Sequence, residues 1–171
     1  TQSTWYADTD LDTFGNPSAS QLSCVQPGGY VADNTDCDDA DGANYPGNTE
    51  VCDGGDNDCD TLVDDADPGV DPSTQGTWYA DTDLDTFGDP AVNQLSCAQP
   101  GGYVADSTDC DDADGNNFPG NNEVCDGSDN DCDTLVDDAD PGVDPATQST
   151  WYADTDLDTF GNPSASQLSC V

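Results

Sequence analysis

The sequence predicts small, irregular, largely β repeats with little regular secondary structure, stapled by disulfides and calcium-binding loops in a linear tandem array. Three observations carry this prediction. The segment TQxTWYADTD begins at Thr1, Thr74 and Thr147, which gives a period of 73 residues. Each full repeat holds four cysteines and several runs of alternating aspartates. No window shows the apolar periodicity of a useful helix, and strong helix formers are scarce.

Two full repeats and part of a third make up the chain: residues 1–73, 74–146 and 147–171. The first two differ at twelve positions, and residues 147–171 reproduce the start of the chain without a change. Near-identical copies without insertions indicate that every repeat meets its neighbour in the same way. Because the third copy stops in mid-unit after Cys170, we expect the array to continue.

The charge of the chain is its most unusual property. It has 38 acidic residues and no Lys, Arg or His, for a formal net charge of −38. No carboxylate can therefore be neutralised by another side chain, and a chain of this kind stays disordered unless something external compensates. Divalent cations are the expected partners. Nucleic acid and anionic membranes are excluded as electrostatic partners, because both require a basic surface.

Each repeat opens with a predicted strand over residues 5–7, rich in strand formers. The run DTDLD follows at residues 8–12 and has the ligand spacing of a calcium loop, with Phe14 supplying a backbone carbonyl and Asn16 at position 9. Position 12 is Ala19, so the closing carboxylate must come from elsewhere. Two further short strands, over residues 21–25 and 30–32, are separated by a Pro-Gly-Gly turn.

A second acidic cluster, DCDDADG, covers residues 36–42. The only two glutamates of the chain, Glu50 and Glu123, each follow such a cluster once per repeat. Because a glutamate is long enough to bind calcium with both oxygens, we interpret Glu50 as the residue that closes a site with these aspartates.

The third acidic segment, CDGGDNDCDTLVDDAD, covers residues 52–67 and returns at residues 125–140 with one change. Counted from Asp56, aspartates stand at positions 1, 3, 5, 9 and 12, the ligand rhythm of an EF-hand-like calcium loop. Position 6 is Thr61, where such loops use Gly, and position 12 is the short Asp67. Both departures predict a weaker or differently closed site.

The predicted metal ligands of all copies are oxygen donors, which favour calcium over zinc or copper. They are Asp8, Asp10, Asp12, Phe14, Asn16, Asp36, Asp38, Asp39, Asp41, Glu50, Asp56, Asp58, Asp60, Leu62, Asp64, Asp67, Asp81, Asp83, Asp85, Phe87, Asp89, Asp109, Asp111, Asp112, Asp114, Glu123, Asp129, Asp131, Asp133, Leu135, Asp137, Asp140, Asp154, Asp156 and Asp158. The alternative to a metal site is a solvated acidic turn, but random acidic sequence does not keep one ligand register twice.

Four cysteines per repeat allow two disulfides with three connectivities. We favour Cys24–Cys37 with Cys52–Cys59, because local pairs would clamp each metal loop; a Cys37–Cys52 bond remains open. A four-thiolate zinc site is the rival, but no C-x-x-C pair exists. Cys170 occupies the position of Cys24, so its partner is expected outside this chain.

The stretch DCDDADGANYPGNTEVCDGGDNDCDTLVDD resembles the Cys- and Asp-rich metal-binding motif repeats of secreted and surface-attached bacterial proteins. More distantly, the loops are similar to the thrombospondin type 3 calcium repeats. The resemblance implies calcium binding in an extracellular repeat protein. Leu11, Thr13 and Thr61 stand where the family usually has Gly.

Three functions compete. The leading one is an extracellular structural protein, rigidified by calcium and disulfides, whose copies join head to tail into a fibre, filament or surface stalk. The second is an acidic protein that buffers calcium or nucleates mineral. An enzyme is disfavoured, because without His, Lys or Arg there is no ready general base near neutral pH and no cationic clamp. Disulfide-rich composition favours an extracellular location, without membrane insertion.

Overall fold

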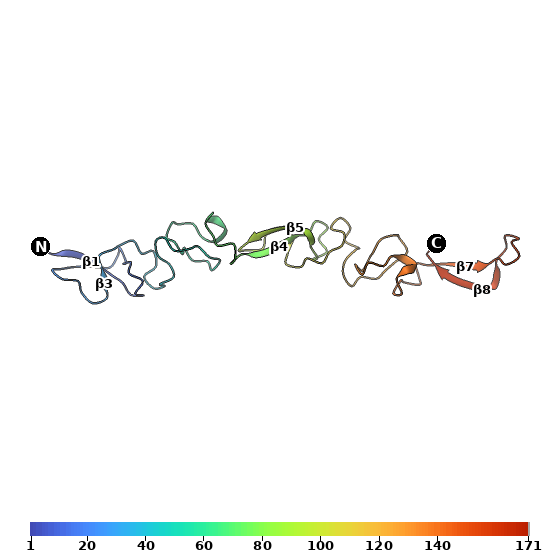
Figure 1. Cartoon of the computed structure of the whole chain (residues 1–171), viewed down its shortest axis with the longest axis horizontal. Coiled ribbons are helices and arrows are strands. Elements are labelled where there is room, and N and C mark those ends of the chain that lie inside the picture. Colours follow the sequence, from blue (N-terminus) through green and yellow to red (C-terminus); the bar gives the residue numbers. More distant parts are fainter. Residues whose placement is uncertain (171) are drawn as a thin grey trace. The chain divides into compact units, whose positions relative to one another are not determined.

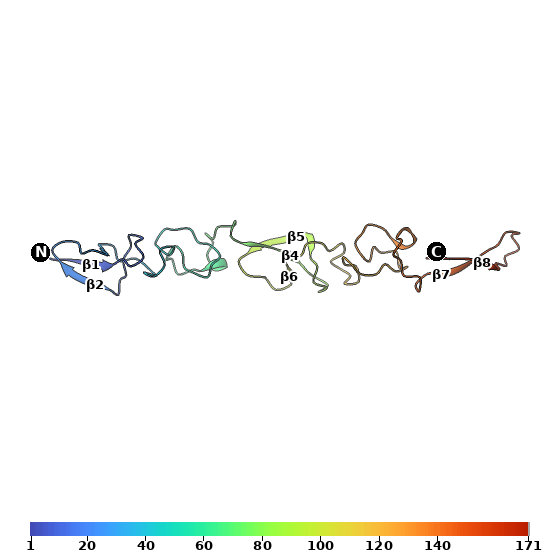
Figure 2. The same cartoon turned by 90° about the horizontal axis from the view of Figure 1, so that it is seen from below.

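The computed structural model describes residues 1–170 and consists of short antiparallel sheets connected by long irregular segments. β1 (Ser3–Ala7) pairs with β2 (Ser20–Ser23) and with β3 (Tyr30–Val31), so that the sheet order is β2-β1-β3. Figures 1 and 2 show these strands at the blue end of the chain. Residues Trp5 to Ala7 favour this sheet because aromatic side chains pack well on a pleated surface.

The same arrangement returns in the second repeat. β4 (Gly76–Ala80), β5 (Asp89–Ser96) and β6 (Tyr103–Val104) form a sheet of order β5-β4-β6. In the last segment β7 (Ser149–Ala153) pairs with β8 (Asn162–Ser169), with a register irregularity at the end of β7. The three strands expected from the sequence of a repeat are therefore present.

Helical structure is confined to two 3₁₀ turns, η1 (Asp64–Ala66) and η2 (Asp137–Ala139), within residues 1–170. The prediction of little regular secondary structure is confirmed. The chain divides into two compact units: Thr1–Gly76 with Leu95–Ala98, and Thr77–Gln94 with Gln99–Val171. The end of β5 thus belongs with the first unit rather than with the rest of its own repeat.

The interior of each repeat is polar. None of the hydrophobic side chains described is buried, whereas Asp8, Asp36, Asn44, Glu50, Asn57 and Asp67 are, together with their six equivalents in the second repeat. The few apolar contacts include a stacked pair of rings, Phe14 on Tyr45, with centroids 5.5 Å apart. A chain with this interior cannot rely on hydrophobic burial for its stability.

One glycine is required by close packing. A Cβ on Gly15 would lie 2.6 Å from the carbonyl oxygen of Asp33 and 2.8 Å from the Cβ of Tyr6. Gly15 therefore lets the first aspartate loop lie directly against the sheet.

The disulfides differ from the favoured pairing. Cys37 bonds to Cys59, and Cys52 bonds to Cys97 of the next repeat; Cys110–Cys132 and Cys125–Cys170 repeat the pattern. The predicted Cys24–Cys37 and Cys52–Cys59 bonds are wrong, and so is the open alternative Cys37–Cys52. The expectation that Cys170 lacks a partner in this chain is wrong as well.

The reason is that spacing along the sequence is a poor guide to spacing between loops. The two acidic segments fold onto each other and bring Cys37 beside Cys59, which is 22 residues further along the chain. Strand β5 of the next repeat ends just before Cys97 and brings it to Cys52, 45 residues earlier. Within residues 1–170, Cys24 is the one free cysteine, and it is exposed.

Four disulfides indicate an oxidising compartment, either extracellular or periplasmic. In the part of the chain described by the structure, no helix has the length and apolar character needed to span a bilayer.

Candidate metal centres

The aspartates of the first loop are held by their own backbone. An Oδ1 atom of Asp10 accepts the N–H of Asp12 at 3.2 Å, and that of Asp12 accepts the N–H of Phe14 at 2.7 Å. Asp36 does the same with the N–H of Asp38, at 2.8 Å. Such Asx turns fix each carboxylate through one oxygen and leave the second oxygen for another partner.

The carboxylates of the two segments converge. Asp8, Asp10 and Asp39 each offer an oxygen within 4.8 Å of the others, and so do Asp10, Asp12 and Asp36. We call these five residues the first carboxylate group. The carboxylates missing at the end of the 8–12 loop are thus supplied from about 25 residues further along the sequence.

The most informative feature of these loops is a set of buried carboxylate oxygens that have no hydrogen-bond partner. One oxygen each of Asp8, Asp10, Asp12, Asp36 and Asp67 is buried without any hydrogen-bond partner, and the same holds for Asp81, Asp83, Asp85, Asp109 and Asp140. These are the same five positions in both repeats. A buried carboxylate oxygen without a partner is strongly unfavourable, and the chain has no cationic side chain to supply one.

The electrostatics point the same way. Desolvation raises the pKa of Asp10 and of Asp36, and repulsion from neighbouring carboxylates adds to it. The pKa values of Asp83 and Asp109 are raised for the same reasons. A divalent cation at this position would relieve both effects, because it replaces the lost solvent and cancels the repulsion.

Asp39 differs from its neighbours. Desolvation raises its pKa, but hydrogen bonds outweigh this effect and the pKa lies below its usual value. Both oxygens of Asp39 are engaged by Thr9, one by the N–H at 2.7 Å and one by the hydroxyl at 2.8 Å. Asn16 points its amide at the same carboxylate, at 3.5 Å. Asp39 therefore links the two segments of the first carboxylate group.

A second carboxylate group forms on the 56–67 loop. Asp56, Asp58 and Asp60 offer oxygens within 4.8 Å of one another, and Glu50, Asp58 and Asp67 do so as well. Asp56 accepts the N–H groups of Asp60 and Thr61, each at 3.0 Å.

Glu50 belongs to this second group and not to the 36–42 cluster with which the sequence pairs it. Its side chain is almost fully buried. One carboxylate oxygen accepts the N–H of Asn57 and the other that of Asp64, both at 2.8 Å. The expected closure over Asp36 to Asp41 is therefore wrong in its grouping, because Glu50 reaches forward along the chain into the loop after it.

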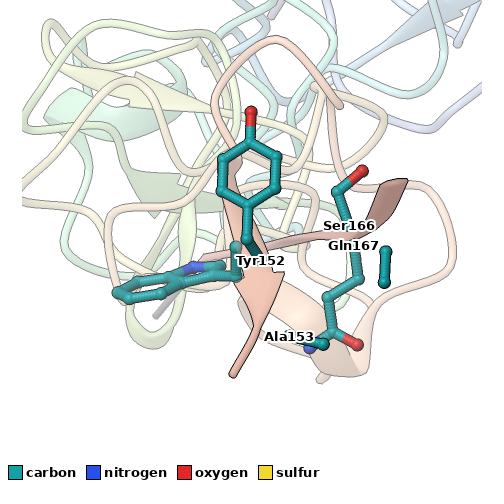
Figure 3. Close-up of a pocket in the computed structure, with 6 residues that line it drawn as sticks. Tyr152, Ala153, Ser166 and Gln167 are labelled. Atoms are coloured by element: carbon teal, nitrogen blue, oxygen red, sulfur yellow. The ribbon is translucent and has the colours of Figure 1, made fainter. Parts of the chain in front are cut away.

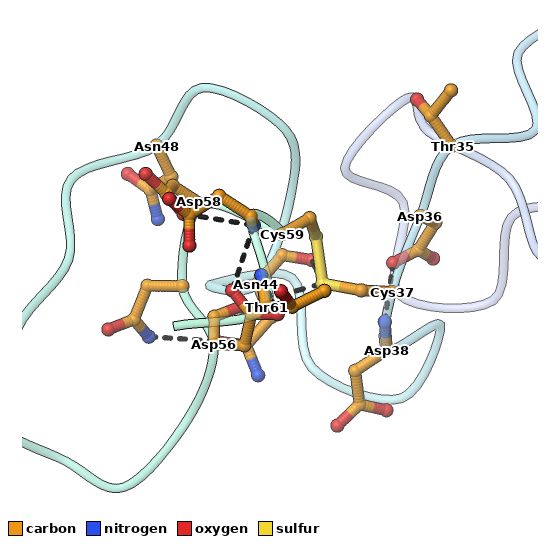
Figure 4. The surroundings of a disulfide bond; sticks show 12 residues. Thr35, Asp36, Cys37, Asp38, Asn44, Asn48, Asp56, Asp58, Cys59 and Thr61 are labelled. Atoms are coloured by element: carbon orange, nitrogen blue, oxygen red, sulfur yellow. Dashed lines mark hydrogen bonds between the residues drawn. A yellow bond between two sulfur atoms is a disulfide. The ribbon is translucent and has the colours of Figure 1, made fainter. Parts of the chain in front are cut away.

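The disulfide Cys37–Cys59 connects the two groups covalently, since Cys37 follows Asp36 and Cys59 follows Asp58. Figure 4 shows this bond with Asp36 and Asp38 on one side and Asp56 and Asp58 on the other. The 36–42 cluster, expected from the sequence as a separate site, contributes Asp36 and Asp39 to the first group, and Glu50 joins the second.

Several predicted ligands lie in other settings. Asp38 and Asp41 are exposed and accept the N–H groups of Ala40 and Ala43. The carboxylate of Asp64 accepts the N–H of Gly54 at 3.0 Å. In the third copy, Asp154 accepts the N–H groups of Asp158 and Thr159, which is the pattern of Asp56 and not that of Asp8.

The sequence did not point to two asparagines that organise the second group. Asn57 accepts the N–H of Val51 at 2.9 Å and donates to the side-chain oxygen of Asn44 at 2.8 Å. Both are buried. The available signal was that both asparagines persist, within otherwise acidic segments, in the second repeat as Asn117 and Asn130.

The three residues that stand where the resembling repeats usually have Gly adopt the left-handed backbone conformation that favours Gly. Leu11, Thr13 and Thr61 have φ values of 70°, 84° and 79°, in the left-handed region. A β-branched residue is unfavourable there, so each threonine stores strain in a loop that carries candidate ligands.

A separate shallow pocket lies on the β7–β8 hairpin, between Trp151, Tyr152 and Gln167 (Figure 3). No carboxylate lines it, and the side chains of Trp151 and Tyr152 are about half exposed. This pocket is not part of either candidate centre.

A family model described as "putative metal-binding motif", with the short name Cu-binding_MopE, matches residues 36–65 and 109–138. The chain carries this motif twice. Each match includes the 36–42 cluster, Glu50 and most of the second group, or their equivalents, and the resemblance noted above is confirmed. The strands and the 8–12 loop lie outside the matched residues. No curated protein and no solved structure was found to be similar.

Proposed function

We propose that this chain is an extracellular structural repeat protein, rigidified by calcium and stapled by disulfides, whose copies join head to tail into a fibre, filament or stalk. The observation that carries the proposal is the set of buried, unpartnered carboxylate oxygens at the same five positions of both repeats. Cations at these positions would connect segments that are distant in the sequence and so fix the shape of each repeat.

Calcium is favoured over the copper in the family's name by the donors themselves. Both carboxylate groups consist of oxygen donors alone, the chain has no His or Met, and eight of the nine cysteines are in disulfides. Copper is bound best by nitrogen and sulfur ligands, whereas calcium takes six to eight oxygens. Extracellular calcium loops with affinities of about 10⁻⁴–10⁻³ M would be filled at millimolar calcium.

The experiment compares the intact chain in millimolar calcium and in chelator. We expect loss of ordered structure by circular dichroism and hydrogen exchange in chelator, with the disulfides intact, and a regular assembly in calcium by electron microscopy. An unchanged spectrum in chelator would refute calcium dependence. A monodisperse monomer in calcium would refute assembly alone. Titration with Cu²⁺ in parallel tests the choice of metal.

The second candidate, a calcium buffer or mineral nucleator, is favoured by the many aspartates that face solvent, such as Asp33, Asp38 and Asp41. A nucleator presents its carboxylates to solvent, whereas a calcium-rigidified repeat encloses them. The unpartnered oxygens are buried, which supports the structural role. We propose no catalytic role, because the chain has no His, Lys or Arg to serve near neutral pH.

A further inference from the structure

The cysteine that follows β2 forms no disulfide within residues 1–170. Cys24 is free and exposed, immediately after β2. Its sequence context, QLSC, occurs three times, ending at Cys24, Cys97 and Cys170. The other two cysteines are both in disulfides, with Cys52 and Cys125, each 45 residues earlier.

Each of those two disulfides lies beside an aspartate that binds the incoming strand. Asp65 accepts the hydroxyl of Ser96 at 2.6 Å and the N–H of Cys97 at 2.7 Å. Asp138 in the same way accepts the hydroxyl of Ser169 and the N–H of Cys170. We call Cys125 with Asp138 the acceptor.

The hydrogen bonds at Asp65 are strong enough to shift its titration. The hydroxyl of Ser96, then the N–H of Cys97, lower the pKa of Asp65 to about 2. These hydrogen bonds hold the strand end at Asp65, beside the Cys52–Cys97 disulfide.

The free strand end shows the undocked state of the same groups. At Cys24 the hydroxyl of Ser23 accepts the N–H of Val25 at 3.3 Å. At the docked ends the equivalent serine hydroxyls instead donate to Asp65 and Asp138. Residues 1–25 are identical to residues 147–171, so the free end has every group that the docked end uses.

We propose that the Ser23–Cys24 end of β2 is a covalent docking element, and that its partner is the Cys125–Asp138 acceptor of a second copy of this chain. The proposal rests on the head-to-tail assembly proposed above and identifies the bond that would join two chains. Asp138 of the second copy would receive the Ser23 hydroxyl and the Cys24 N–H as it receives those of Ser169 and Cys170.

The reaction is a thiol–disulfide exchange and needs no oxidant. The Cys24 thiolate attacks Sγ of Cys125, the Cys24–Cys125 bond forms, and the Cys125–Cys170 bond breaks. Cys170 leaves as a thiolate and takes up the proton. Inside one chain Cys170 competes at an effective concentration on the order of millimolar, so at about 10 µM protein wild type is expected to hold little of the linked product at equilibrium.

The test therefore removes the competitor. In Cys170→Ser, kept in millimolar calcium with a glutathione redox buffer, glutathione disulfide takes up the two electrons of the new bond. We expect a ladder of multimers on a non-reducing gel, and a Cys24–Cys125 linked peptide by mass spectrometry. The double variant Cys24→Ser/Cys170→Ser should stay monomeric on the gel.

A second variant tests the carboxylate. Asp138→Asn in the Cys170→Ser background should slow linkage about fivefold or more, because hydrogen bonds to a charged acceptor are the stronger ones. Asp33→Asn is the control, since Asp33 is exposed and lies outside the acceptor, and should leave the rate unchanged. Equal rates in the two variants would overturn the role of Asp138.

Absence of any linkage, or only Cys24–Cys24 dimers, would overturn the proposal. Its failure can be distinguished from failure of the assembly itself. Sedimentation of Cys24→Ser in millimolar calcium reports non-covalent assembly alone, so particles in that variant without a Cys24–Cys125 bond in Cys170→Ser would leave assembly standing and remove only the covalent junction.

Discussion

Replacing Asp36 by Asn should change stability in opposite directions with and without calcium. Asp36 is buried, and its Oδ1 accepts the N–H of Asp38 at 2.8 Å, a bond that Asn can keep. Its other oxygen has no partner. Asp36→Asn therefore removes a charge while preserving the local turn.

The size of the stability change without metal follows from the repulsion between Asp36 and its neighbouring carboxylates. Asp10 and Asp12 each offer an oxygen within 4.8 Å of one on Asp36. Two unit charges at that separation repel by about 0.9 kcal/mol even with the dielectric constant of water, so two neighbours contribute about 2 kcal/mol. The metal-free variant should be more stable than wild type by about that amount.

With calcium the sign reverses. A carboxylate about 2.4 Å from a doubly charged ion is attracted by roughly 3.5 kcal/mol with the same dielectric constant, and this exceeds the relieved repulsion. The calcium-bound variant should be less stable than wild type by about 1.5 kcal/mol, and the site should bind calcium roughly 300-fold more weakly.

In millimolar calcium the assay is urea unfolding, monitored by circular dichroism. In metal-free buffer, where the wild type is expected to be disordered, the assay is folding induced by trimethylamine N-oxide. Asp109→Asn repeats the experiment in the second repeat. Asp33→Asn is the control, because Asp33 is exposed and outside both carboxylate groups, and should change little in either medium. A shift of the same sign in both media would refute the electrostatic reasoning.

Three further outcomes are expected. In metal-free buffer, stability should rise as the pH falls from 7 toward the ordinary carboxyl pKa of 3.8, because carboxyls with raised pKa values, such as Asp10 and Asp36, favour the folded state when protonated. Urea or osmolyte midpoints measured across this pH range test this, and calcium should reverse the trend. Thr61→Gly should stabilise the calcium-bound chain by about 1 kcal/mol, because Thr61 has a φ of 79°; an unchanged urea midpoint would show that no strain is stored there. Asp58→Ala should weaken calcium binding far more than Asp71→Ala, whose carboxylate accepts the N–H of Ser73, and equal losses by calorimetry would mean that charge alone holds the metal.

Much of the local structure of this protein follows from short stretches of its sequence. The period of 73 residues, the short strands and the scarcity of helix are local properties, because strand formers, turn residues and apolar periodicity act over a few neighbouring residues. The alternation of aspartates also determines their local geometry, since each Asx turn joins a residue to one two positions later, as in Asp12 and Phe14.

The tertiary structure decided which local pieces meet. Asp36 joins the 8–12 loop, Glu50 joins the loop after it, and Cys52 reaches into the following repeat. None of these pairings has a signature in spacing, because the loops between them are irregular and nothing periodic sets their length. Carboxylates that repel one another along the sequence come together only where the backbone supplies N–H donors, as at Glu50, and where a cation can supply the remaining charge.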